Sequence, residues 1–267
     1  MEYKFIRSGL LAGLLAGIAA YVFARIVLEP LVTKGIDYEE ARSHAESAIT
    51  GEHAHEHEVF SRSVQENIGA GVGSIVFGLV MGALFAVAFT VVWGYVGRRH
   101  RGADPRLVAA LLAAAGFVAV YLVPFAAYPA NPPGVGNDET IGERTGAYLT
   151  ITLLSVGFAI AAAVLGLWLV GKLGGLLAAI SAGAFYVVAV AISIVVLPSY
   201  NDVPTALTDG NEILFDGFPA ATLADFRFYS VINQVVLWTV LGIVFTLALT
   251  RIARRANIST PESALVS

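Results

Sequence analysis

The chain has 267 residues, of which 57% are hydrophobic and only 13% are charged. A soluble domain carries about twice that charged fraction, so the composition excludes an ordinary soluble protein. The chain contains no cysteine, which excludes disulfides and thiolate metal sites. Its formal net charge is −4, and nothing in the composition indicates a nucleic-acid partner. The 27 glycines are typical of closely packed membrane helices.

Six apolar segments follow one another along the chain, and each is near or above the roughly 20 residues that cross a bilayer. They cover residues 6–28, 68–96, 107–127, 147–170, 173–197 and 229–252. We therefore predict an all-α integral membrane protein, with six transmembrane helices in a single membrane domain surrounded by lipid.

The first apolar segment has an alternative interpretation as a cleaved signal peptide, because basic residues precede it. Against this, Gly9, Gly13 and Gly17 recur every four residues on one helix face. Such spacing allows close contact between membrane helices. We expect the first segment to remain as a transmembrane helix.

The basic residues predict the orientation of the chain, because lysine and arginine favour the cytoplasmic side. With both termini in the cytoplasm, that side holds Lys4, Arg7, Arg98, Arg99, Arg101, Arg106, Lys172, Arg251, Arg254 and Arg255. Of the 20 acidic residues only three, Glu2, Asp104 and Glu262, then lie inside, and the other 17 lie outside. An acidic outer surface raises the local concentration of cations.

Three long outer loops follow from this topology, at residues 29–67, 128–146 and 198–228. Each odd-numbered helix ends near a proline, and Arg62, Arg144 and Arg227 each precede an even-numbered helix. This pattern suggests three helical-hairpin repeats about an axis along the membrane normal. The alternative is that prolines and charges mark the end of any helix.

The first outer loop contains His53, His55 and His57, with Glu56 among them. Imidazole and carboxylate groups suit Co²⁺, Ni²⁺, Zn²⁺ or Mn²⁺. Two or more of these nitrogens can reach one ion whether the tract is extended or helical. A tract that exchanges ions quickly would fit transport, with the metal as substrate and no permanently bound cofactor. The alternative is a solvated acidic loop that happens to contain histidines.

Further candidates line the expected pathway. Glu29 lies at the outer mouth of the first helix, where it could instead pair with Arg25 as an interfacial anchor. Asn233 and Gln234 are the strongest polar candidates within a span, although such residues more often join helices by hydrogen bonds. The list is completed by Asn131 and Arg144 in the second outer loop.

No Asp, Glu, Lys, Arg or His lies near the middle of any span. Many ion-coupled transporters place one there, so this absence argues against an autonomous pump. The sequence also has no nucleophile motif, Walker loop or dinucleotide fingerprint, and we do not expect an enzyme.

Several stretches resemble the CbtA family of predicted bacterial cobalt transporter subunits. They are Glu29-Pro30-Leu31, Asp37-Tyr38-Glu39, His53-Ala54-His55-Glu56-His57-Glu58 with Phe60, Val123-Pro124, the stretch from Tyr128-Pro129-Ala130-Asn131-Pro132-Pro133 to Gly136, Glu139-Thr140, Arg144 and Tyr148. The resemblance implies a cobalt permease subunit of the bacterial plasma membrane. It also implies a small, one-helix, His-bearing partner, CbtB. It supplies no established transport residues.

The leading expectation is a membrane permease subunit for divalent metal uptake, with cobalt as the substrate and nickel or zinc as alternatives. The second is a non-transporting accessory or scaffold subunit of a larger complex, which the uncharged membrane core favours. The third is a metal sensor or metallochaperone receptor. The sequence does not specify the number of copies in an assembly.

Overall fold

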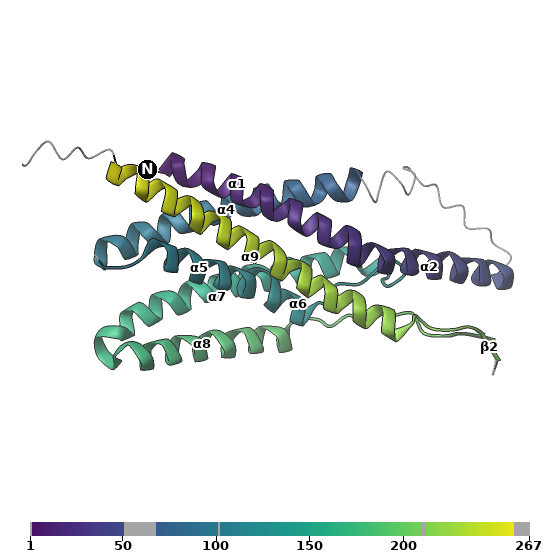
Figure 1. The fold of residues 1–267 in the computed structure, drawn as a ribbon. Coiled ribbons are helices and arrows are strands. Elements are labelled where there is room, and N and C mark those ends of the chain that lie inside the picture. The colour runs from purple at the N-terminus through teal and green to yellow at the C-terminus, as the bar shows by residue number, and fades with distance from the viewer. Residues whose placement is uncertain (1, 51–67, 101, 210–211, 259–267) are drawn as a thin grey trace, which may run out of the picture. The chain divides into compact units, whose positions relative to one another are not determined.

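The computed structural model describes residues 2–50, 68–100, 102–209 and 212–258 (Figure 1). Its α-helices are α1 (Glu2–Phe23), α2 (Glu29–Thr50), α4 (Ala70–Arg99), α5 (Pro105–Gly116), α6 (Val123–Ala127), α7 (Ile141–Leu173), α8 (Gly175–Val196) and α9 (Ala220–Ile258). Two π-helices, η1 (Ala24–Leu28) and η3 (Phe117–Leu122), and one 3₁₀ turn, η4 (Asp138–Thr140), lie between them. A short antiparallel hairpin, β1 (Leu207–Asp209) and β2 (Glu212–Phe215), adds to the expected helical architecture.

Six helices in the described part of the chain are long and apolar enough to cross a membrane. Each of them overlaps one of the six predicted apolar segments, and the all-α membrane class is confirmed. Their outward faces carry large apolar side chains that are exposed. The exposed fractions of Leu153, Leu176 and Val195 are 72%, 76% and 85%. A water-soluble protein would bury such residues, whereas lipid contact satisfies them.

The π-helices η1 and η3 each lie just ahead of a proline. η1 ends at Leu28, two residues before Pro30, and η3 ends at Leu122, two residues before Pro124. Proline has no N–H to donate and crowds the turn before it, and a widened π turn accommodates both effects within a continuing helix. The first and third apolar helices therefore share one local distortion. The three-hairpin repeat itself stays a prediction.

The chain divides into two compact units. The first comprises Met1–Ile26, Val59–Ala115 and Ile232–Ser267. Within it, α1 packs along α4 with glycine facing glycine. A Cβ added at Gly17 would lie 2.6 Å from the carbonyl oxygen of Ser74, and one at Gly78 would lie 2.7 Å from the Cα of Gly17. These backbones touch directly, so the predicted small-residue face is the contact surface of two helices.

Aromatic rings fill the rest of this first unit. The ring of Phe245 makes edge-to-face contacts with Phe85 and Phe89, with centroids 5.0 Å apart in both pairs. Phe89 and Phe245 are completely buried. Edge-to-face packing places ring hydrogens against the negative face of the neighbouring ring, which adds stability beyond simple burial.

The second unit comprises Val27–Glu58 and Gly116–Val231. In it, α7 and α8 form a hairpin that turns at Gly174, whose φ of +77° favours glycine (Figure 1). The hydroxyls of Ser155 on α7 and Tyr186 on α8 are hydrogen-bonded at 2.8 Å. Because the two hydroxyls are hydrogen-bonded to each other, neither is left without a partner between the membrane helices.

Residues 29–50 of the expected first outer loop are helical and form α2. The helix continues from α1 through η1 into α2, and the π turn of η1 accommodates Pro30 without ending the helix. Arg42 and Glu46 are then paired at 2.9 Å across one turn. The second unit thus has a polar helix among its loops, and the candidate site is built on it.

Candidate functional site

Helix α2 is anchored to the rest of the second unit by Tyr38. The ring of Tyr38 contacts the rings of Phe218 and Phe215, with centroids 4.8 and 5.4 Å apart. Its hydroxyl donates a hydrogen bond to the carbonyl oxygen of Asp216 at 3.1 Å. Tyr38, Val135 and Phe218 are buried together as a small apolar core. This core fixes one face of α2 against two loops at once.

We call these segments the proline loop, residues 128–137, and the hairpin loop, residues 197–219. The proline loop reaches α2 by a close backbone approach. A Cβ added at Gly35 would lie 2.6 Å from the carbonyl oxygen of Pro133, and Gly134 has a φ of +75°. Both positions need glycine, the first because there is no space and the second because of its conformation.

The hairpin loop is held to α2 by Arg42. Its NH1 group donates to the carbonyl oxygen of Thr205 at 2.7 Å and to the hydroxyl of Tyr38 at 3.2 Å. Its Nε group donates to Glu46 at 2.9 Å. One guanidinium thus joins a helix, a loop and an aromatic anchor through its Nε and NH1 groups.

Residues that follow each loop contact the other loop. Arg144, at the start of α7, forms an ion pair with Asp202 at 3.2 Å, and the hydroxyl of Thr140 donates to the same carboxylate oxygen at 3.2 Å. In return, Arg227, on α9 just after the hairpin loop, donates to the side-chain oxygen of Asn131 at 2.8 Å. An arginine that follows the proline loop therefore contacts the hairpin loop, and an arginine that follows the hairpin loop contacts the proline loop.

Tyr128 adds a third tie between the same loops. Its hydroxyl donates to the carbonyl oxygen of Pro198 at 2.7 Å, and its ring lies against that of Tyr200. Burial, with a smaller contribution from Tyr200, raises the pKa of the Tyr128 hydroxyl. The phenol therefore stays protonated and remains the donor of this hydrogen bond over the physiological pH range.

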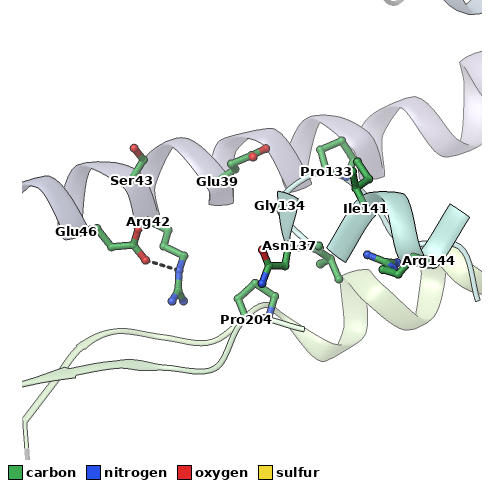
Figure 2. Close-up of a pocket in the computed structure, with 12 residues that line it drawn as sticks. Glu39, Arg42, Ser43, Glu46, Pro133, Gly134, Asn137, Ile141, Arg144 and Pro204 are labelled. Carbon is green, nitrogen blue, oxygen red and sulfur yellow. Dashed lines mark hydrogen bonds and ion pairs between the residues drawn. The ribbon is translucent and has the colours of Figure 1, made fainter. Parts of the chain in front are cut away.

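A pocket of about 440 Å³ lies between α2, the proline loop and the start of α7. Figure 2 shows Arg42 and Glu46 on α2 on one side, Asn137 and Pro204 in the middle, and Arg144 on the other side. All the lining residues belong to the second unit. The pocket size is that of a small-molecule site, and its wall carries charges of both signs.

The predicted site residues fall into three groups. His53, His55, His57 and Glu56 lie outside the residues that the structure describes. Asn131 and Arg144 both lie in the loop network just described. Glu29 begins α2, and its carbonyl oxygen accepts a hydrogen bond from the Thr33 hydroxyl at 3.1 Å.

Asn233 and Gln234 belong to α9 in the first unit. The side-chain oxygen of Asn233 is buried and has no hydrogen-bond partner among the described residues. Gln234 is half-buried. Within the described ranges, no group of three or more histidine, aspartate or glutamate side chains is placed to hold a metal ion. The roles of Asn233 and Gln234 in a transport pathway therefore stay predictions.

Sequence reasoning missed Tyr38, Arg42 and Asp202 as parts of a site, and it noted Arg227 only as a mark of a repeat. One signal was present. The three predicted outer loops contain only four arginines, and three of them, Arg42, Arg144 and Arg227, each contact a segment that is distant in sequence. An arginine kept among many carboxylates is a candidate for a specific ion pair rather than for orientation in the membrane.

Comparison with known proteins then places the chain. No curated protein matches it, and no solved structure matches it. The family described as probable cobalt transporter subunit (CbtA) matches residues 2–250, which include five of the apolar helices, most of the sixth and both loops of the pocket. The chain belongs to the CbtA family of probable cobalt transporter subunits.

Proposed function

We propose that this chain is the permease subunit for uptake of a divalent metal, with cobalt as its substrate and the His53–Glu58 tract as the outer capture segment. The observation that carries the proposal is the family match over residues 2–250 of a chain with six membrane-crossing helices. Nickel and zinc are the competing substrates, because imidazole and carboxylate ligands accept them as well. A small His-bearing subunit, CbtB, is the proposed partner.

Uptake of labelled cobalt into proteoliposomes tests this proposal. We expect vesicles that contain the purified chain, alone or with its small partner, to accumulate cobalt faster than empty vesicles. Nickel and zinc, added in excess, should compete. Empty and loaded vesicles that take up cobalt at the same rate, with and without the partner, would argue for the second candidate function.

That second candidate is a non-transporting accessory subunit of a larger complex. It is favoured by the absence of Asp, Glu, Lys, Arg and His from the middle of the spans. Co-purification with a large complex would support it, whereas cobalt uptake by the isolated chain would exclude it.

The orientation that we propose places both termini in the cytoplasm of a bacterial plasma membrane, and it can be tested with single cysteines because the chain has none of its own. Ser199 is exposed in the hairpin loop, and Gly102 lies exposed before α5 with nothing within 4 Å of an added Cβ. We expect Ser199→Cys to react with a membrane-impermeant thiol reagent in intact cells, and Gly102→Cys to react only after lysis. The reverse pattern would invert the topology.

A further inference from the structure

We propose that the pocket between α2 and the start of α7 binds a small ligand that carries a carboxylate next to a positive centre, either a free amino acid or the metal chelate of one. The chelate form rests on the proposed function, because it would bring the transported metal to the protein already complexed. The carboxylate recognition rests on the pocket alone. The argument begins with Arg144.

The guanidinium of Arg144 has N–H donors that its contact with Asp202 does not use. Its side chain is 25% exposed and lines the pocket. Among the residues that the structure describes, it makes one ion pair, from NH1 to Asp202 at 3.2 Å, and no other hydrogen bond. A guanidinium offers five N–H donors in one plane, a geometry that matches the two oxygens of a carboxylate. A second carboxylate is therefore the group that completes its surroundings.

Asn137, in the middle of the lining, presents a further donor (Figure 2). Its side-chain oxygen accepts a hydrogen bond from the backbone N–H of Glu139 at 2.9 Å, which fixes the amide group. With the oxygen engaged, the NH₂ group is the part left to meet a ligand. Arg144 and Asn137 both line the pocket, and each offers N–H groups to an anionic ligand.

The α2 wall carries an excess of negative charge, with two carboxylates and one guanidinium. Glu39 and Glu46 both line the pocket from α2, and Glu46 is paired with Arg42 at 2.9 Å. With two guanidinium and two carboxylate groups, the lining is balanced in formal charge. A lone anion would be repelled by the α2 wall, and a bare cation would be repelled by Arg144. A ligand with both charges satisfies both walls.

A bare metal ion is a poor occupant for a second reason. The described residues contain no group of three histidine, aspartate or glutamate side chains that could coordinate one. A chelated metal brings its own ligands and needs only charge complementarity. The rest of the wall, which includes Pro133, Val135, Ile141 and Pro204, offers apolar contact for a ligand's carbon skeleton.

Calorimetry with three probes tests the proposal, namely L-histidine, Co²⁺, and the preformed cobalt–histidine complex. Histidine is suitable because it is a zwitterion that also chelates cobalt. The titrations use the full-length purified chain in which His53, His55 and His57 are replaced by alanine, so that the capture tract cannot contribute. We expect histidine, its complex or both to bind, and Co²⁺ alone not to bind.

Two pocket variants and one matched control make the test specific. Asn137→Asp keeps the oxygen that accepts from Glu139 but replaces the donor with a negative charge, so it should weaken binding at least tenfold without disturbing the turn. Arg144→Gln should have a similar effect and also loses the pair with Asp202. Arg106→Gln is the control, because Arg106 is likewise paired with an aspartate, Asp104, at 2.8 Å, but lies outside the pocket.

The outcomes separate the two sources of the ligand. Equal binding of histidine and its complex indicates a free amino-acid site, and binding of the complex alone indicates a chelate site; both support the carboxylate proposal. If neither probe binds, or if Asn137→Asp leaves binding unchanged, the proposal is wrong. A chain that binds histidine but transports no cobalt would keep this inference and lose the proposed function.

Discussion

Replacing Gly78 by alanine should destabilise the first unit by about 3 kcal/mol, the upper end of the usual cost of overpacking. A Cβ at this position would overlap the carbonyl oxygen of Gly13 and lie 2.7 Å from the Cα and 2.8 Å from the N of Gly17. These atoms are backbone, so no side chain can rotate away. For a chain of this size, the thermal midpoint in detergent should fall by roughly 6–12 °C.

Gly73→Ala is the matched control. Gly73 lies on the same helix, α4, but a Cβ there would meet nothing within 4 Å. Alanine favours a helix over glycine by about 1 kcal/mol at either position, so propensity cancels in the comparison. Equal midpoints for the two variants would show that α1 and α4 are not in direct backbone contact.

Changing His53, His55 and His57 together to alanine should abolish divalent metal binding by the chain. We expect the unchanged chain to bind with roughly micromolar affinity, about 8 kcal/mol, with Ni²⁺ and Cu²⁺ above Co²⁺ and Zn²⁺ below Cu²⁺. Imidazole binds a metal only when it is neutral. Affinity should therefore be constant above the ordinary histidine range near pH 6.5 and should fall as the pH drops through it.

Calorimetry on the purified variants measures this effect, and the other two histidines provide the control. His44 lies on α2 and His100 follows α4, and both are exposed. A variant with His44 and His100 changed to alanine should keep the metal affinity. Metal binding that persists in the triple variant would mean that the tract is only a solvated loop. Thermal midpoints equal to that of the unchanged chain would confirm that neither variant disturbs the fold.

The six membrane helices could be predicted because a span needs only length and apolarity, and neither depends on knowledge of neighbouring segments. The glycine spacing on the first helix even indicated which face packs. The continuation of that helix as α2 could not be predicted in the same way. Residues 29–50 are polar, and their helix is stabilised by tertiary contacts such as Tyr38 with Phe215 and Phe218.

The candidate site was less predictable, for a related reason. Arg144 and Asn131 were selected as polar residues in an outer loop, but their partners, Asp202 and Arg227, lie far along the chain. Hydrophobic length carries no information about which loop meets which. A pairing of this kind requires the helices to be placed first, and a single sequence does not place them.

The contacts between segments that are distant in sequence also have a consequence for biosynthesis. Asn131 is contacted by Arg227, which lies 96 residues later, and Thr140 binds the side chain of Asp202, which lies 62 residues later. During translation the proline loop is therefore synthesised well before either partner has been made. Since chains are built from the N-terminus, the loop must wait in an incomplete state until α9 emerges. A nascent chain halted before α9 would present this loop to insertion and quality-control factors with its last tie missing.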